Sequence, residues 1–291
     1  MQDIRIVFLG TSSGTPTRER NVSSVAVILD GTVLLFDCGE ATQHQLQKSP
    51  VKSGAIEAIC ITHLHGDHVY GLPGLLATMS MNARARPLTL VGPEMLRPYV
   101  ECALATTDHH PVFPIDIAPP PYRGAGFTIV AAPLDHRIPA FGYCLIEDDR
   151  PGAFDVEKAR ALGIPPGPQY AELVRNHDPR VLGPSRRGRR IVYCTDTRPC
   201  PSAVELARGA DVLIHEATYT SDLAEEADER RHSTAAGAAR IAAEAGVSRL
   251  IITHFSTRYR DAEALLAEAR AVFPNTDAAS DFACFDVPPT L

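Results

Sequence analysis

The chain has 291 residues and a formal net charge of −7 at neutral pH, with 45% hydrophobic and 22% charged residues. This composition is that of an ordinary folded protein and excludes wholesale disorder. The acidic balance also argues against a protein that coats nucleic acid non-specifically, although it leaves room for a local basic patch.

Strand-like and helical segments alternate along the chain. Apolar runs rich in β-branched residues predict strands over 4–10, 23–29, 32–39, 58–63, 87–92, 127–133, 142–147, 190–196, 212–217, 250–255 and 282–287. Helical patterns predict helices over 41–48, 72–81, 94–105, 202–208, 233–245 and 261–272, and the last two have apolar residues at three- and four-residue spacing. This interleaving indicates an α/β layered domain.

One segment, residues 148–190, interrupts the alternation. It is rich in proline, glycine and charge, contains GIPPGP and VLGPSRRGRR, and shows little periodicity. A long irregular stretch in a compact domain is usually functional or disordered. We therefore expect a single domain over residues 1–291 with an insertion at 148–190. Its arginines, Arg186, Arg187, Arg189 and Arg190, are candidate phosphate contacts, with a solvated surface loop as the alternative.

Sequence features also bear on location. The amino-terminal MQDIRIVFLG lacks the basic region, apolar stretch and cleavage site of an export signal, and no stretch approaches the roughly 20 apolar residues that cross a bilayer. The seven cysteines are scattered without a C-x-x-C pair, as expected in a reducing cytosol. We expect a cytoplasmic protein that does not enter a membrane.

The densest group of chelating side chains is His63-Leu64-His65-Gly66-Asp67-His68, which follows directly on the apolar strand-like segment EAICIT, residues 57–62. Imidazole and carboxylate groups are zinc ligands. Core packing rarely places four such groups within six residues. His63, His65, Asp67 and His68 therefore predict a metal site.

Three further candidates stand at the carboxyl ends of later strands: His136, Asp196 and His254. Each alone could be an ordinary turn-capping residue. Ligands at the ends of neighbouring strands converge at one edge of a sheet, however, where open α/β folds place their sites. Together with the first group they are numerous enough to bind two metal ions.

The segments that carry these residues resemble one family. FLGTSSGTPTRERNVSS, LLFDCGEATQ, HLHGDHVYGLPGLL, LDHRIPAFGY, YCTDTRP, IHEATY, HSTAAGAARIA and ITHFSTRY occur in the order found in the ribonuclease Z family, the tRNA 3′-processing endonucleases of the metallo-β-lactamase superfamily. The resemblance implies a four-layer αββα sandwich. The sequence departs from the family pattern at three places. Within the insertion, a short NHDPR segment replaces a longer polar hairpin, and Ala41 and Cys194 stand where glycine is expected.

The resemblance also implies a ligand set. His63, His65 and His136 would hold one zinc ion, Asp67, His68 and His254 the other, and Asp196 would bridge them. Manganese or another divalent metal would suit the same nitrogen and oxygen donors. Two zinc ions about 3.5–4 Å apart can share a hydroxide and stabilise in-line displacement at phosphorus, which favours phosphodiester hydrolysis.

Three residues are candidates for proton transfer. By resemblance, Asp67 would be the general base, and Glu216 would orient His232, which would protonate the departing 3′ oxygen. From the residues alone, Glu216 could equally be a strand-end ion-pair partner and His232 a residue at the start of a helix.

The resemblance implies precursor tRNA as the substrate and a homodimer as the assembly. Arg18, Arg20 and Asn21 belong to a loop that in the family lies near the cleavage site, although a solvent-exposed turn is the alternative. The insertion at 148–190, with Arg186 and Arg187, would be an arm that binds the tRNA cut by the partner subunit. Two other functions stay open: a small-molecule or cyclic-nucleotide phosphodiesterase that uses the same metals, and an inactive tRNA-binding module.

Overall fold

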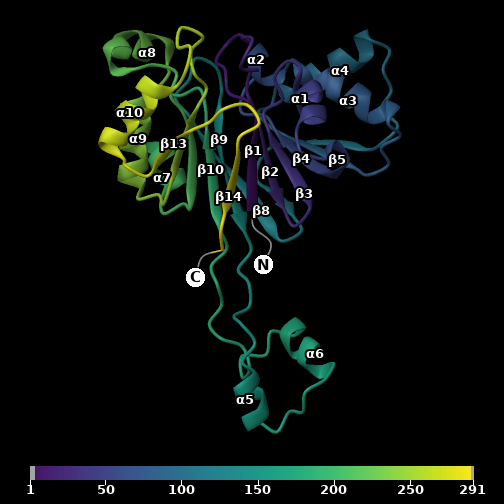
Figure 1. Cartoon of the computed structure of the whole chain (residues 1–291). Helices are drawn as coiled ribbons and strands as arrows, with labels where there is room; N and C mark the ends of the chain where they lie inside the picture. The colour runs from purple at the N-terminus through teal and green to yellow at the C-terminus, as the bar shows by residue number, and fades with distance from the viewer. Residues whose placement is uncertain (1–3, 290–291) are drawn as a thin grey trace.

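The computed structural model of the chain describes residues 4–289 and contains two sheets that pack face to face (Figure 1). The strands of the first sheet are β1 (Ile4–Gly10), β2 (Ser24–Leu29), β3 (Thr32–Phe36), β4 (Ile56–Cys60), β5 (Leu88–Val91), β6 (Ile115–Ala118) and β14 (Cys284–Val287). The strands of the second are β7 (Tyr122–Gly124), β8 (Phe127–Pro133), β9 (Phe141–Glu147), β10 (Arg190–Cys194), β11 (Val212–Glu216), β12 (Leu250–Thr253) and β13 (Thr276–Ala278). The strand orders are β14-β1-β2-β3-β4-β5-β6 and β13-β12-β11-β10-β9-β8-β7.

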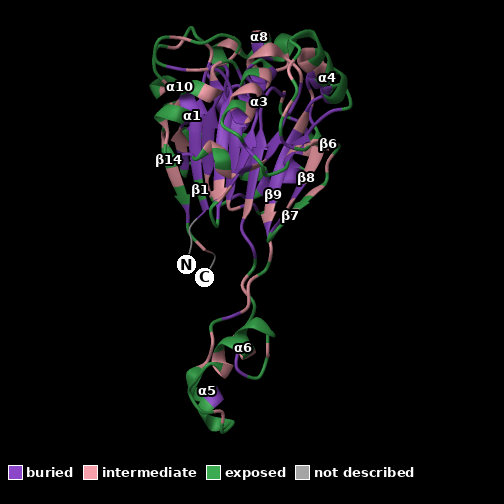
Figure 2. Cartoon of the chain, turned by 90° about the vertical axis from the view of Figure 1, so that its right-hand side faces the viewer, coloured by how far each residue is buried: buried purple, intermediate pink, exposed green. Residues whose placement is uncertain are grey.

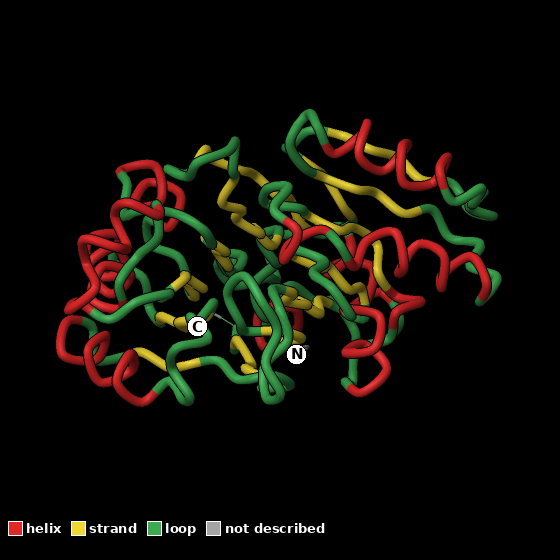
Figure 3. The backbone as a smooth tube through the Cα atoms, turned by 90° about the horizontal axis from the view of Figure 1, so that it is seen from above, coloured by secondary structure: helices red, strands yellow, loops and turns green. Residues whose placement is uncertain are grey.

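Helices cover the outer face of each sheet, as the view from above shows (Figure 3). The first sheet packs against α1 (Thr42–Lys48), α3 (Gly71–Met81) and α4 (Leu96–Thr106). The second packs against α7 (Pro201–Ala207), α9 (Ala235–Ala245) and α10 (Glu263–Val272). The remaining helices are α2 (Gly66–Val69), α5 (Val156–Ala161), α6 (Gln169–Arg175), α8 (Ala224–Arg230) and two short 3₁₀ turns at Ser53–Ala55 and Ser221–Leu223.

The strands are apolar on both faces because each face is buried in a different core. In β1, Ile6 and Phe8 point between the sheets, whereas Val7 and Leu9 point toward the helices of the first layer. Side chains alternate in this way along any strand. The long apolar runs of the sequence therefore follow from a four-layer αββα arrangement, which confirms the predicted fold.

Several short elements are absent from the sequence prediction. β6, β7 and β13 have only three or four residues, and α8 follows directly on a 3₁₀ turn. Elements of this length have too few residues to show a hydrophobic period. α5 carries a usable signal, because the Asp155 side chain caps it by accepting a hydrogen bond from Lys158 N at 3.0 Å.

The segment between β9 and β10 leaves the body as two extended stretches and ends in α5 and α6 (Figure 1). We call residues 148–189 the arm. Most of its side chains are exposed, in contrast to the buried strands of the body (Figure 2). At its root, the buried Arg189 guanidinium donates to both oxygens of Glu147, at 2.7 and 2.9 Å, and to Val287 O at 2.7 Å. These bonds fix where the arm leaves the body.

The direction of the strands determines which end of the body carries functional residues. β10, β11, β12 and β13 are parallel, as are β3, β4, β5 and β6. Their carboxyl ends therefore lie at one end of the sandwich, opposite the end from which the arm projects (Figure 1). No helix within residues 4–289 has both the length and the apolar character that a membrane span requires.

Candidate metal centre and active site

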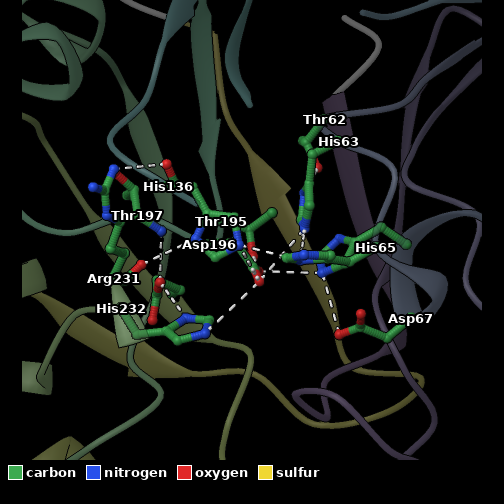
Figure 4. A network of polar contacts seen from close by, with 12 residues as sticks. Thr62, His63, His65, Asp67, His136, Thr195, Asp196, Thr197, Arg231 and His232 are labelled. Carbon is green, nitrogen blue, oxygen red and sulfur yellow. Dashed lines mark hydrogen bonds and ion pairs between the residues drawn. The ribbon is translucent and has the colours of Figure 1, made fainter. Parts of the chain in front are cut away.

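All seven residues predicted as metal ligands converge at the carboxyl ends of the strands. Their donor atoms fall into two groups, each with all atoms within 4.8 Å of one another. His63, His65, His136 and Asp196 form the first group, and Asp67, His68 and His254 form the second. Figure 4 shows Asp196 between the histidines of the first group and His232.

The first group brings three imidazole rings edge to edge. His65 Nδ1 lies 3.0 Å from His63 Nε2 and 3.2 Å from His136 Nε2. The Asp196 carboxylate faces the same point, with Oδ2 3.6 Å from His63 Nε2 and 3.7 Å from His136 Nε2. Two donors about 2.1 Å from a tetrahedral zinc ion lie about 3.4 Å apart, so these separations suit ligands of one ion.

The second group has the same spacing. His68 Nε2 lies 3.3 Å from Asp67 Oδ2, and His254 Nε2 lies 3.6 Å from the same oxygen. Asp196 reaches this group as well, since its Oδ1 is 3.2 Å from His68 Nε2 and 3.0 Å from His254 Nε2. The two oxygens of Asp196 thus face one group each.

Hydrogen bonds to the far side of four imidazoles aim the other ring nitrogen at the cluster. His63 Nδ1 lies 3.0 Å from Thr62 Oγ1, and His136 Nδ1 lies 3.1 Å from Arg231 O. The ring nitrogens of the second group are held in the same way: His68 Nδ1 is 2.8 Å from Asp37 Oδ2, and His254 Nδ1 is 3.0 Å from Thr218 Oγ1. A ring that donates from Nδ1 presents a bare lone pair at Nε2, as metal-binding histidines do.

The buried Nε2 atoms of His68 and His254 make no hydrogen bond within the described chain. A buried nitrogen without a partner costs free energy unless another group satisfies it. A divalent cation among these nitrogen and carboxylate donors would do so, and the residues fit such an ion. The His and Asp clusters therefore form a site suited to divalent metal binding.

Burial and mutual charge set the protonation of these groups. Burial lowers the pKa of His65 and His136, and lowers that of His63 well below its ordinary value. Burial opposes ionisation of Asp196, yet His254 and His68 hold the pKa of Asp196 well below its usual value. The centre therefore favours neutral imidazoles in the first group beside an ionised carboxylate, which are the forms that bind metals.

Asp37, a buried carboxylate that the sequence analysis did not single out, holds residues of the cluster by hydrogen bonds. Asp37 follows β3 and accepts hydrogen bonds from Thr62 N at 2.8 Å, Tyr193 OH at 3.0 Å and His68 Nδ1 at 2.8 Å. It thereby ties the loop after β4 to β10. Its place as the charged residue that ends the apolar run of LLFDCG was the available signal.

Two of the candidate ligands have a backbone conformation that side chains rarely adopt. Asp196, two residues after β10, and His254, directly after β12, have φ of 52° and 60°. For residues other than glycine this region costs roughly 1–2 kcal/mol and is concentrated at functional sites. Ala41, where the family has glycine, also has a φ of 59°. Cys194, the other position where the family has glycine, packs closely on Gly142. A Cβ atom added at Gly142 would lie 3.0 Å from the Cys194 sulfur.

Beside the cluster, Glu216 and His232 form a buried pair. His232 Nδ1 donates to Glu216 Oε1 at 2.9 Å, and His232 Nε2 faces Asp196 Oδ2 at 4.0 Å. The fully buried Glu216 carboxylate also accepts from Thr197 N, Thr218 Oγ1 and Ser233 N. Although burial disfavours a charged imidazole, Glu216 and Asp196 raise the pKa of His232 to about 9. The pair therefore directs an imidazole N–H toward the metal cluster.

These groups open on a cavity of about 490 Å³ lined by His65, Asp67, Asp196 and His232. Three arginines that the sequence analysis did not single out also line it: Arg137, Arg230 and Arg258. Arg258 lies over the Tyr219 ring at 5.0 Å and pairs with Glu226 at 2.9 Å, and Arg230 pairs with the same glutamate at 3.0 Å. The cavity wall thus carries cations that suit a polyanionic ligand.

The loop that contains Arg18, Arg20 and Asn21 borders the site, but its residues differ in placement. Gly14 N in this loop donates to Asp67 Oδ2 at 2.8 Å, and Arg18 is exposed. Arg20, by contrast, is only 9% exposed, donates to Tyr259 O and lies 5.8 Å from the Phe255 ring centroid. Asn21 donates from its backbone to Asp281 and from its side chain to Glu40 O. The Arg20 guanidinium is engaged in holding the loop, and its contact with substrate stays a prediction.

The arginines predicted as phosphate contacts in the arm do not join the metal cluster. The backbone of Arg186 forms an antiparallel β-bridge with that of Arg150 across the two stretches of the arm. The Arg187 side chain forms a salt bridge with Asp211 at 2.7 Å. Arg189 is buried with Glu147, and Arg190 begins β10. These residues lie at the arm root, at the opposite end of the sheets from Asp196.

The comparisons with known proteins agree with this geometry. A family model described as "Beta-lactamase superfamily domain" matches residues 174–255, and one described as "Anti-Pycsar protein Apyc1" matches residues 4–107. The chain is 49% identical to Ribonuclease Z of Gloeothece citriformis, with 98% of this chain and 96% of that protein covered. It is 47% identical to Ribonuclease Z of Trichodesmium erythraeum, with the same coverage.

The solved structures include a similar tRNase. Human tRNase Z, short form, superposes with a TM-score of 0.73 at 30% sequence identity, and the match covers 98% of this chain and 99% of that one. Near-complete coverage, high identity and an intact set of converging histidines and aspartates lead to one assignment. The chain belongs to the ribonuclease Z family, the tRNA 3′-processing endoribonucleases of the metallo-β-lactamase superfamily.

Proposed function

We propose that the chain is a zinc-dependent endoribonuclease that hydrolyses the phosphodiester between a precursor tRNA and its 3′ trailer, leaving a 3′-hydroxyl on the tRNA. The observation that carries this proposal is the shared cavity: His232, oriented by the buried Glu216, lines it together with residues of both donor groups, and His232 Nε2 lies 4.0 Å from Asp196 Oδ2. A proton donor beside a metal cluster suits the departure of an alkoxide from phosphorus.

In this proposal the site holds two zinc ions. His63, His65 and His136 would hold one, Asp67, His68 and His254 would hold the other, and Asp196 would be shared between them. The spacing of the donor atoms and the bare Nε2 atoms of His68 and His254 support this ligand set. When bound, two divalent cations supply an acidified water and offset charge on the phosphoryl oxygens.

The protein side chains then handle the protons. Asp67 accepts the proton of the attacking water. Gly14 N fixes the position of Asp67 Oδ2 at 2.8 Å. Although burial opposes ionisation, His68 and His254 lower the pKa of Asp67, which keeps the carboxylate in its ionised form. His232 donates the proton of Nε2 to the departing 3′ oxygen while Glu216 holds Nδ1. The water oxygen bonds to phosphorus and the P–O3′ bond breaks, so the phosphate stays on the trailer and the tRNA keeps a 3′-hydroxyl.

RNA is the substrate that best suits the surroundings of the cluster. Arg137, Arg230 and Arg258 line the cavity, and Arg18 is exposed on the bordering loop. Cationic side chains around a cleft attract the phosphate backbone. We assign Arg18 and Asn21 to the loop that approaches the acceptor end, and retain Arg186 and Arg187 as contacts of the arm root.

The place of the arm supports a homodimer. The arm leaves the end of the sandwich opposite the metal cluster, so the arm tip of a chain lies away from that chain's own site (Figure 1). If the arm binds tRNA far from the acceptor end, a second copy supplies the catalytic cluster. We therefore propose a cytoplasmic homodimer in which the arm of one subunit holds the tRNA that its partner cleaves.

The deciding experiment is cleavage of a 3′-extended precursor tRNA, with the product ends mapped, by the wild type and by Asp67→Ala in zinc and in manganese. We expect cleavage beside the discriminator base and a loss of at least 10²-fold in kcat for the variant, the scale of one general base. Asp286→Ala removes a distant surface carboxylate paired with Arg5 and serves as the control. Wild-type inactivity in both metals, or full inhibition by a small cyclic phosphodiester that is itself hydrolysed faster, would contradict the proposal.

A further inference from the structure

We propose that Arg231 is a positioning residue: it holds the metal-facing orientation of His136 and joins the His136 loop to the His232 loop. This inference rests on the proposed role of His136 as a metal ligand. Nothing in the sequence pattern singles out Arg231, which stands between two polar or charged neighbours, Arg230 and His232. Its backbone and its contacts distinguish it.

The backbone of Arg231 adopts the left-handed region, with a φ of 58°, immediately after α8. Glycine takes this conformation readily and is the usual residue where a helix ends in this way, whereas an arginine pays a steric cost of about 1 kcal/mol. A residue kept there against its preference is held by other interactions, and such residues gather at functional sites. The turn itself would favour glycine, so we look to the contacts of the arginine side chain for the reason that an arginine stands here.

Arg231 holds the His136 segment from two directions (Figure 4). Its carbonyl oxygen accepts a hydrogen bond from His136 Nδ1 at 3.1 Å, which fixes the ring and leaves Nε2 bare toward His65. Its guanidinium Nη1 donates to His136 O at 3.0 Å and to Asp135 Oδ1 at 3.1 Å. Ring and backbone of His136 are thus attached to the same residue.

Asp135 extends the connection to a third loop. Its other oxygen, Oδ2, accepts a hydrogen bond from Arg198 Nη2 at 2.9 Å, and its backbone N–H donates to Thr197 Oγ1 at 3.1 Å. Arg198 and Thr197 follow Asp196 directly, and Arg198 Nη1 also donates to Asp228 of α8 at 3.1 Å. The segments that carry His136, Asp196 and His232 are therefore joined through one carboxylate and two guanidinium groups.

This arrangement predicts what removal of the side chain does. In Arg231→Gly the carbonyl oxygen remains and the left-handed turn becomes easier, but the bonds to Asp135 Oδ1 and His136 O are lost. Partners that orient a ligand histidine typically contribute 10- to 100-fold to metal affinity. We expect a variant that unfolds at the wild-type temperature or above it without metal, yet binds zinc about tenfold more weakly.

The experiment measures zinc affinity of the full chain by competition with a chromophoric chelator, together with thermal unfolding in the absence of metal. Arg231→Gly is compared with Arg231→Lys, which keeps the charge but not the two-acceptor geometry of the guanidinium, and we expect an intermediate loss of affinity. Arg208→Ala removes an exposed arginine paired with Glu205 and is expected to leave zinc binding unchanged. Should Arg231→Gly fail to fold, Arg231→Lys carries the test.

His136→Ala tests whether His136 is a metal ligand, independently of the positioning role of Arg231. If it leaves zinc affinity unchanged, His136 is not a ligand and the proposed function loses that assignment. If it weakens zinc binding while Arg231→Gly and Arg231→Lys bind zinc as the wild type does, the ligand assignment stands and the positioning role of Arg231 is overturned.

Discussion

Glu216 shows how a single buried carboxylate can orient the imidazole of His232 beside the donor cluster. It has no exposed surface, and backbone N–H groups of Thr197 and Ser233 donate to it from two different loops, at 2.7 and 3.0 Å. Burial opposes its ionisation, yet His232 and its hydrogen bond lower the pKa of Glu216. A carboxylate held this firmly fixes both the tautomer and the direction of His232.

Replacement of His232 tests its role as the proton donor. His232→Ala should lower kcat for precursor tRNA by about 10²- to 10⁴-fold, the range of general acid catalysis, while the bound metal content stays at the wild-type level. A phosphodiester with an activated leaving group needs no such proton and should lose far less. An equal loss on both substrates would show that His232 acts on the site as a whole and not on the leaving group.

At the level of single residues, sequence reasoning found the side chains whose type reveals their chemistry. Seven histidines and aspartates at strand ends could be predicted to converge, because parallel strands end at one edge. The residues that support them could not. Asp37 and Arg231 act through hydrogen bonds across loops far apart in sequence, and Arg20 looks like a solvent-exposed cation until its partner Tyr259 O is known.

The arm is the element whose structure depends least on the rest of the molecule. It is inserted between two antiparallel neighbours, β9 and β10, in which Ile146 pairs with Arg190. The bonds between Glu147 and Arg189 close its root. The chain could therefore turn directly from one strand into the other without disturbing the sheet.

Arm removal separates tRNA binding from chemistry. Replacing residues 149–187 by Asn-Gly, which favours a tight hairpin turn, should leave folding and hydrolysis of a small phosphodiester unchanged. The KM for precursor tRNA should rise about tenfold or more, which corresponds to a loss of at least about 1.4 kcal/mol of binding, while kcat changes little. Steady-state kinetics on both substrates give the answer, and an unchanged KM for tRNA would show that the arm does not bind it.

Helices and strands differ in how well they can be predicted from their sequences. Long strands such as β1 and the alanine-rich α9 have enough residues to show a period, and both were predicted. α5 and α6 have six and seven residues and lie among prolines and glycines, so the insertion looked irregular along its whole length. Edge strands such as β6 are partly exposed, and their short apolar pattern is weak.

For the whole molecule, the decisive fact is that the candidate ligands come from both sheets. His63, His65, Asp67 and His68 follow β4 of the first sheet, whereas His136, Asp196 and His254 follow β8, β10 and β12 of the second. The two donor groups are therefore assembled across the interface between the sheets. Without a cation, two buried carboxylates and several bare ring nitrogens lie close together at this interface.

Metal removal should consequently affect the stability of the entire fold. A ligand present at a thousandfold excess over its Kd stabilises the native state by about 4 kcal/mol, or roughly 10 °C in Tm for a domain of this size. We expect Tm to fall by about this amount after chelation and to recover when zinc or manganese is added. Differential scanning calorimetry at fixed protein concentration measures the shift, and a Tm indifferent to chelator and to both metals would contradict a dinuclear site.

The division of the candidate ligands between two sheets also has a consequence for the order of folding and metal binding. Neither half of the chain contains a full donor set for either proposed ion, so a partly folded chain in which only one sheet has formed offers at most an incomplete coordination sphere. Tight binding begins when the two halves dock. If the proposed ions bind, their uptake would therefore follow the docking of the two sheets, and a chain with separated sheets would lack both donor sets.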